Sequence, residues 1–120
     1  MKKEIIIDMC IKLAKKSIVK YQHGSIIINS NKIIGCGYNK LYPKNGIKST
    51  CHAEVDALLS LQKSPKYCKN STIYVVRLSG KNEKQLGDSK PCENCFNRMK
   101  QYNIARVIYS TPSGLESIFI

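Results

Sequence analysis

The sequence predicts an α/β fold in which helices cover a β-sheet. Segments with helical spacing of apolar residues alternate with short β-branched runs, in the order α-β-β-α-β-α-β. The chain of 120 residues, 42% of them hydrophobic, is long enough to bury one core, which predicts a single domain over residues 1–120. Because helices connect the last strands, we expect those strands to be parallel.

The first expected elements are an amphipathic helix and a hairpin. Near the N-terminus, apolar residues recur at helical spacing at Ile6, Met9, Cys10, Leu13, Ala14 and Ile18. The stretch "GSIIINSNKIIGCGYN" then predicts two apolar strands joined by a tight turn at Asn29, Ser30 and Asn31.

The second half of the chain predicts two helix and strand pairs. We expect a helix over 52–61, a strand over 71–78, a helix over 92–103 and a strand over 105–111. Residues 40–50 and 79–90 are rich in polar and turn-forming residues and are expected to be loops. The sheet is expected to end almost at this fourth strand, unless Ile118, Phe119 and Ile120 form a short fifth.

Charge and cysteine usage indicate the environment and the partners. The net charge of +12 favours polyanionic partners such as nucleotide phosphate or nucleic acid, although dispersed lysines can also be a solvated surface. The basic N-terminus lacks an apolar run of signal or membrane-span length, so no membrane association is expected. The six cysteines are scattered, which predicts a reducing, cytoplasmic environment.

The most distinctive short motif is "PCENC", which places Cys92 and Cys95 one helical turn apart behind Pro91. Such a pair can be a redox disulfide, half of a structural zinc site or part of a catalytic one. A redox pair is expected to follow an early strand, whereas this one follows a long polar segment. A structural zinc site needs four protein ligands, and no second Cys-x-x-Cys pair exists. Three ligands with one open position fit best.

His52, in "TCHAEVDALL", is the candidate third ligand, and Glu54 follows two residues later. A metal lowers the pKa of water, and a neighbouring carboxylate can take up and return the proton. Taken alone, His52 could equally be a surface histidine at a helix start, with Glu54 favouring the positive helix end.

Together, "HAE" and "PCENC" form the His-x-Glu and Pro-Cys-x-x-Cys signature of zinc-dependent nucleobase deaminases. The sequence here resembles the cytidine and deoxycytidylate deaminase family over nearly its whole length. The resemblance implies a three-layer α-β-α fold with a mixed sheet of about five strands. It also implies Zn²⁺ as cofactor, with His52, Cys92 and Cys95 as its ligands and Glu54 as the catalytic proton shuttle.

Further segments match the same family. "IIGCGYNKLYPKNG" resembles the region before the zinc histidine, where an asparagine binds the sugar, so the resemblance assigns substrate binding to Asn39. "HGSIIINSNKIIG" resembles the first hairpin, which adds Gly24 and Ser25 as substrate contacts, and Ala53 joins them from the "HAE" motif. His23 is interpreted as a loop histidine with satisfied hydrogen bonds rather than a ligand.

Two departures from the family pattern bear on these assignments. Asp56 stands where many deoxycytidylate deaminases have asparagine, which leaves the substrate set open. Cys51 precedes His52, and because some relatives use cysteine as first ligand, a shift of the ligand by one residue is a second option.

The expected function is zinc-dependent hydrolytic deamination of a free cytosine nucleoside or nucleotide, of the dCMP or cytidine type. The alternatives are a base deaminase acting on tRNA or single-stranded nucleic acid, a deaminase of guanine or another nucleobase, and a non-catalytic zinc module. The apolar C-terminus "GLESIFI" has little chain to pack against, so the chain is expected to form homo-oligomers.

Overall fold

The computed structural model describes residues 1–44, 47–61, 68–79 and 82–120, and for 42–44, 47–49 and 82–84 it describes the backbone. The helices are α1 (Lys3–Lys15), α2 (Ala53–Leu59) and α3 (Glu93–Gln101). The strands are β1 (His23–Asn29), β2 (Lys32–Tyr38), β3 (Lys40–Lys44), β4 (Ile47–Cys51), β5 (Ser71–Ser79), β6 (Asn82–Gly87), β7 (Ile104–Thr111) and β8 (Gly114–Phe119).

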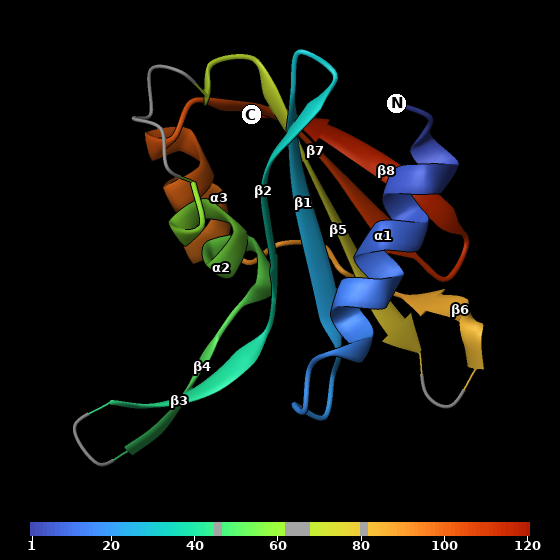
Figure 1. Ribbon diagram of the computed structural model, residues 1–120, viewed down its shortest axis with the longest axis vertical. Helices are drawn as coiled ribbons and strands as arrows, with labels where there is room; N and C mark the ends of the chain where they lie inside the picture. Colours follow the sequence, from blue (N-terminus) through green and yellow to red (C-terminus); the bar gives the residue numbers. More distant parts are fainter. Residues whose placement is uncertain (45–46, 62–67, 80–81) are drawn as a thin grey trace.

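The main sheet is mixed. Its strand order is β2-β1-β5-β7-β8, and β6 pairs with the end of β5. β5 and β7 are parallel, as expected for strands joined by a helix, and the other pairs are antiparallel. β3 and β4 form a separate ladder that extends away from the body of the molecule (Figure 1).

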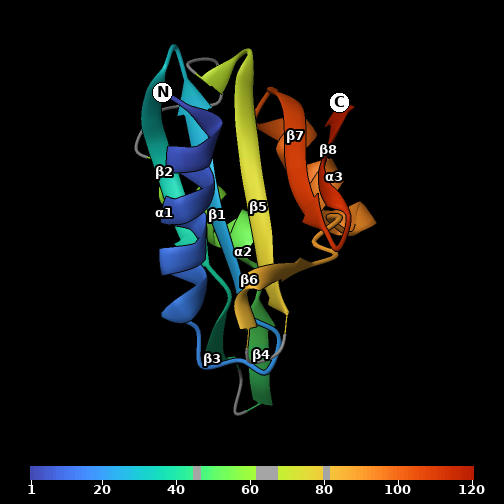
Figure 2. The same ribbon diagram turned by 90° about the vertical axis from the view of Figure 1, so that its right-hand side faces the viewer.

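Alternation along the strands builds two cores, one on each face of the sheet. Ile26, Tyr74 and Ile108 pack with α1 residues in one cluster. The neighbouring Ile27, Ile73, Val75 and Val107 pack with α2 and α3 in the other. Figures 1 and 2 show α1 on one face of the sheet and α2 with α3 on the opposite face. The predicted three-layer α-β-α fold is confirmed.

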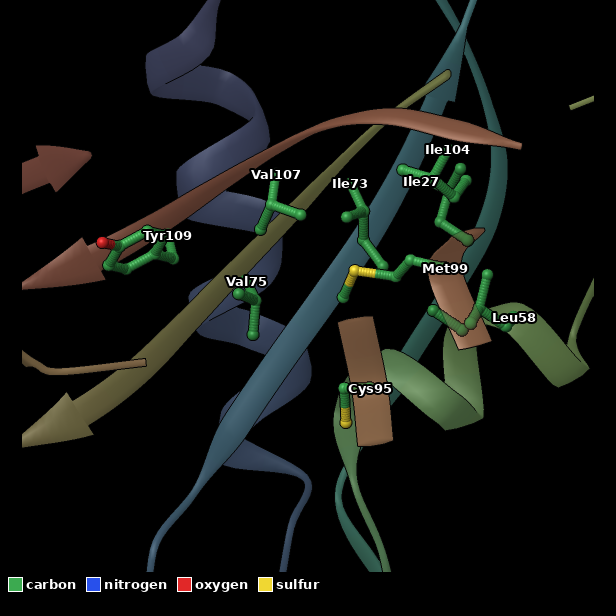
Figure 3. Packing of buried hydrophobic residues seen from close by; sticks show 10 residues of the cluster. Ile27, Leu58, Ile73, Val75, Cys95, Met99, Ile104, Val107 and Tyr109 are labelled. Carbon is green, nitrogen blue, oxygen red and sulfur yellow. The ribbon is translucent and has the colours of Figure 1, made fainter. Parts of the chain in front are cut away.

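Met99 and Cys95 anchor α3 to the sheet. Both side chains are almost fully buried, at 0% and 1% exposure. Figure 3 shows Met99 reaching from α3 toward Ile73 of β5, with Cys95 one turn earlier on the same side of the helix. Burial of the α3 face therefore fixes the position of Cys95.

The turn between β1 and β2 has the conformation that its sequence predicts. Ser30 and Asn31 have positive φ angles of 49° and 63°, and Asn29 pairs with Lys32 across the turn. Two central residues with positive φ make the tight hairpin turn that matches the twist of the strands.

Two helices lie directly on glycines of the sheet. A Cβ atom on Gly24 of β1 would lie 2.0 Å from the carbonyl oxygen of Cys10 in α1. On the opposite face, a Cβ on Gly37 of β2 would lie 2.5 Å from the backbone nitrogen of Ala57 in α2. Only glycine permits backbones to approach so closely.

The loop predictions for 40–50 and 79–90 are wrong, because both segments contain strands. β3 and β4 pair from Lys40 with Cys51 to Lys44 with Ile47. Pro43 argued against a strand, but both strands of a two-stranded ladder are edges, where proline is tolerated. The Asn-Gly dipeptide at 45–46 is the hairpin signal that could have shown this pairing. β6 consists mostly of polar residues, so the pattern of hydrophobic residues did not predict it.

The C-terminal prediction is also corrected. The sheet does not end near β7, because β8 pairs antiparallel with it over six positions, from Gly114 with Thr111 to Phe119 with Arg106. The alternative of a fifth strand at the C-terminus is closer, but that strand begins at Gly114. Most β8 side chains are exposed, so the segment lacks the alternation that marks a half-buried strand.

Among the residues that the structure describes, none of the helices combines the length and the apolar character needed to cross a bilayer.

We expect Gly24→Ala to lower the free energy of unfolding by about 1–3 kcal/mol or more, because the added methyl group would separate α1 from β1. Gly87→Ala is the matched control. Its Cβ would lie 3.2 Å from Cδ of Arg77, a flexible side chain, so a change within about 1 kcal/mol is expected. Urea denaturation of both variants measures the difference, and equal stabilities would contradict this account of α1 packing.

Candidate metal centre and active-site cavity

Several candidate site residues meet at one edge of the main sheet. β1 is antiparallel to β2 and β5, so that His23 pairs with Arg77 near the end of β5 and Gly24 pairs with Tyr38 at the end of β2. Asn39 follows β2 at the same edge. The carboxyl ends of parallel strands are the usual place for a ligand site in such sheets.

His52 and Cys92 occupy equivalent positions at the starts of two helices. Each is the N-cap residue, with extended backbone angles of −67° and 152° for His52 and −74° and 167° for Cys92. N-cap side chains commonly bond to backbone N–H groups of the first turn, but neither of these does. Both side chains are therefore available for another role.

The structure brings His52, Cys92 and Cys95 together. His52 Nδ1 lies 3.4 Å from Cys95 Sγ and 3.8 Å from Cys92 Sγ, and the two sulfur atoms are 3.5 Å apart. One ligand atom from each residue lies within 4.8 Å of the others. The sulfurs are too far apart for a disulfide, which has an S–S bond of about 2.05 Å. Pro91 precedes the N-cap instead of opening the helix, which begins at Glu93.

These spacings fit a zinc ion. Zinc bonds of about 2.0–2.3 Å in a tetrahedron place neighbouring ligand atoms roughly 3.5–3.8 Å apart. One imidazole and two thiols are a donor set that zinc prefers, and three protein ligands leave one position open. His52, Cys92 and Cys95 are thus positioned to hold zinc.

Burial raises the pKa of the Cys95 thiol well above its ordinary range, and the nearby Glu54 and Cys92 raise it further. A raised pKa favours the protonated thiol in the absence of a cation. Binding of a metal requires the thiolate, so metal uptake must release this proton.

The group contains His52 and not Cys51, which disfavours a shift of the ligand by one residue. Cys51 is buried at 8% exposure and its Sγ lies 3.6 Å from the carbonyl oxygen of His52. Burial raises the pKa of its thiol as well.

A cavity of about 370 Å³ opens beside this group. Its lining includes His52 and Cys92 of the candidate centre, together with Ala53, Glu54 and Asn39. Glu54 is only 5% exposed. The same cavity is lined by residues that the sequence did not single out as site residues, namely Val19, Tyr21, His23, Thr50, Ser89 and Lys90. Most of them lie in connecting segments, where hydrophobic periodicity carries no signal.

Gly24 and Ser25 are not among the lining residues of this cavity. Gly24 lies against α1, as described above. Ser25 is fully buried at 0% exposure, and its Oγ has no hydrogen-bond partner in the described part of the chain. Their assignment as substrate contacts stays a prediction.

Asn39 holds the segment between α1 and β1. Its Oδ1 accepts the backbone N–H of His23 at 2.9 Å, and its Nδ2 donates to the carbonyl oxygen of Tyr21. Its own carbonyl accepts the Ser17 hydroxyl at 2.7 Å. One amide hydrogen of Asn39 therefore has a structural use, and the second has no hydrogen-bond partner among the described residues.

Asp56 and Ser89 position the starts of the two helices that carry the candidate ligands. Asp56 Oδ2 accepts the backbone N–H of Tyr38 at 3.1 Å and lies 3.0 Å from Lys40 Nζ, which ties α2 to the end of β2. That carboxylate raises the pKa of Lys40. Ser89 Oγ donates to the Val75 carbonyl at 2.9 Å and accepts the Ser110 N–H at 2.8 Å. These bonds hold the segment before Cys92 against β5 and β7.

Comparison with known families identifies the arrangement. The family described as "Cytidine and deoxycytidylate deaminase zinc-binding region" matches residues 1–111. The chain belongs to this family. Membership supports a deaminase of the zinc-dependent type, with the His52, Cys92 and Cys95 group as its metal centre.

Solved structures of deaminases share the fold. Cytidine deaminase from Burkholderia pseudomallei has a TM-score of 0.75 at 18% identity, covering 99% of this chain and 93% of that one. The dCMP deaminase from cyanophage S-TIM5 in apo form has a TM-score of 0.58 at 21% identity, covering 92% and 86%. Acinetobacter baumannii RibD has a TM-score of 0.56 at 20% identity, covering 93% of this chain and 30% of that one. No curated protein sequence matches this deaminase-family chain significantly.

We expect the chain to bind one zinc ion, and Cys92→Ala or His52→Ala to lose it, because two ligands hold zinc weakly. Cys51→Ala is the matched control, since Cys51 adjoins His52 but lies outside the group, and it is expected to keep full zinc. Zinc per chain after dialysis measures the outcome. Stoichiometric zinc in Cys92→Ala, or its loss in Cys51→Ala, would show that the ligand set is different.

Proposed function

We propose that the chain hydrolytically deaminates a free cytosine nucleoside or nucleotide, of the cytidine or dCMP type, to the uracil product and ammonia. The main support is the position of Glu54. This carboxylate is 5% exposed and lines one cavity together with His52 and Cys92 of the candidate metal centre. An almost fully buried acid beside a metal centre suits proton transfer.

The proposed chemistry assigns Glu54 both proton transfers. Bound zinc supplies activation of water and stabilises developing negative charge. The water oxygen bonds to the ring carbon that carries the amine, and Glu54 passes one water proton to the adjacent ring nitrogen. The C–N bond then breaks, and Glu54 passes the second proton to the departing amine, which leaves as ammonia. Burial of the carboxylate excludes competing water from this transfer.

The remaining wall of the cavity suits a small substrate. A volume of about 370 Å³ lies in the range of small-molecule sites, roughly 300–1,000 Å³. In our proposal the second amide hydrogen of Asn39 binds the sugar, and Ala53 lies beside the base. Tyr21 is the single tyrosine or phenylalanine among the lining residues, whereas binding of extended single strands generally uses several stacking aromatics.

A polynucleotide substrate is the second candidate, and the net charge of +12 is the observation that favours it. In the first candidate substrate the cytosine belongs to a free nucleoside or nucleotide, and in the second it belongs to a polynucleotide. The test is ammonia release from cytidine, dCMP, guanine and single-stranded oligonucleotides by the zinc-loaded chain. Release from oligonucleotides alone would contradict the proposed free substrate.

We expect Glu54→Gln to keep zinc and the fold while turnover falls by about 10²- to 10⁴-fold or more, because the amide cannot carry the proton. Glu93→Gln is the matched control. Glu93 occupies the first turn of α3 next to Cys92 but is exposed and lies outside the cavity lining. The measurement is the rate at which each variant releases ammonia from the same cytosine substrate. Turnover that is unchanged in Glu54→Gln would exclude Glu54 as the proton shuttle.

We also propose that the chain self-associates through the outer edge of β8. This strand ends the main sheet, and Leu115 and Phe119 on it are 41% and 78% exposed. A second copy would cover this apolar edge. Light scattering at micromolar concentration should give a mass above that of the 13.6 kDa chain, and Phe119→Glu should reduce it. A monomer in the unmodified protein would contradict the proposal.

A further inference from the structure

The ring of His23 is oriented by a contact with the backbone two residues earlier. Its Nδ1 lies 3.0 Å from the carbonyl oxygen of Tyr21. A carbonyl oxygen can only accept a hydrogen bond, so Nδ1 carries the proton and donates it. In the neutral ring Nε2 is then unprotonated and can accept a hydrogen bond, and it has no partner among the described residues.

Burial keeps this ring neutral by lowering the pKa of His23 below its ordinary value. Arg77 and His52 also lower it, while the Tyr21 carbonyl and Glu54 raise it. The net effect is a lowered pKa, so at neutral pH the His23 ring is neutral and its Nε2 carries no proton.

His23 lies in the wall of the cavity proposed to hold the substrate. It lines the 370 Å³ cavity together with Asn39 and Glu54. Its backbone is held by Asn39 on both sides: its N–H donates to Asn39 Oδ1 at 2.9 Å, and its carbonyl accepts the Asn39 N–H at 3.3 Å. These bonds place the imidazole in the cavity wall, beside the asparagine to which the sugar is assigned.

The chemistry of a cytosine nucleoside limits what Nε2 can bind. The ring nitrogen N3 and the carbonyl oxygen O2 of cytosine are hydrogen-bond acceptors, so neither can donate a hydrogen bond to Nε2 of His23. The donors are the amine, which the reaction requires at Glu54 and the metal centre, and the sugar hydroxyls. We propose that Nε2 of His23 accepts a hydrogen bond from a ring hydroxyl of the sugar. This inference rests on the proposed function and makes His23 a determinant of sugar specificity.

Two substitutions distinguish the roles of the two ring nitrogens of His23. In His23→Asn the amide takes the place of Nδ1, which keeps the bond to Tyr21 and removes the acceptor in the cavity. In His23→Gln the amide reaches the place of Nε2 and retains an acceptor there. Both are made in zinc-loaded Glu54→Gln protein, so that cytidine, 2′,3′-dideoxycytidine and cytosine can be bound without turnover. Calorimetry gives their dissociation constants, with zinc content and thermal unfolding as checks on the fold.

In the Glu54→Gln protein we expect 2′,3′-dideoxycytidine to bind about 5- to 100-fold more weakly than cytidine, because the acceptor in the cavity wall is left without a donor. His23→Asn should reduce this preference to the part that Asn39 contributes, and His23→Gln should restore it. An unchanged preference in His23→Asn would overturn the inference. An equal loss for all three ligands, cytosine included, would place Nε2 on the amine and also overturn it.

Failure of the proposed function has a separate signature. If the zinc-loaded Glu54→Gln protein binds none of the three ligands, and the unsubstituted protein releases no ammonia from cytosine compounds, the proposed substrate class is wrong and the role of His23 falls with it. If cytidine is bound and deaminated but the sugar preference does not depend on His23, the function stands and the inference alone fails.

Discussion

The meeting of two helix N-termini is the constraint on which the rest of this structure depends. His52 and Cys92 are both N-cap residues whose side chains leave the first-turn N–H groups uncapped, and Cys95 lies one turn further into α3. Their ligand atoms lie 3.4–3.8 Å apart, within reach of one shared metal ion. Burial raises the pKa of the Cys95 thiol, so a cation at this group is what would favour its thiolate form.

Packing of α2 and α3 on the sheet brings these two N-termini together. α2 lies close on Gly37 of β2, and Met99 anchors α3 in the core above β5 and β7. Asp56 and Ser89 then fix the two ends that approach each other. The deaminase signature in the sequence is short, but the positions of its side chains are set by residues spread over the whole family domain.

The parts of the structure that the sequence predicted are those with a strong local signal. The helical period of α1 and the β-branched run of β5 identify buried faces, and the two ligand motifs identify the centre because metal binding demands those residue types. β6 was missed, and β8 was expected only as a short strand at 118–120, because pairing satisfies their backbones without burying an alternating face. His23 was missed as a site residue because its neighbours in the cavity, Asn39 and Glu54, become neighbours only when β1 pairs with β2 and α2 packs on the sheet.

Because β3 and β4 pair with each other, the geometry of the site does not depend on the length of the chain between Asn39 and His52. Its last pair, Lys40 with Cys51, sets Asn39 and His52 side by side, and this pair is independent of what lies at the far end of the hairpin. Adding or removing residues two at a time at that end would leave the register of the last pair unchanged. The hairpin can therefore vary in reach and composition during evolution while the asparagine and the candidate metal-ligand histidine keep their places.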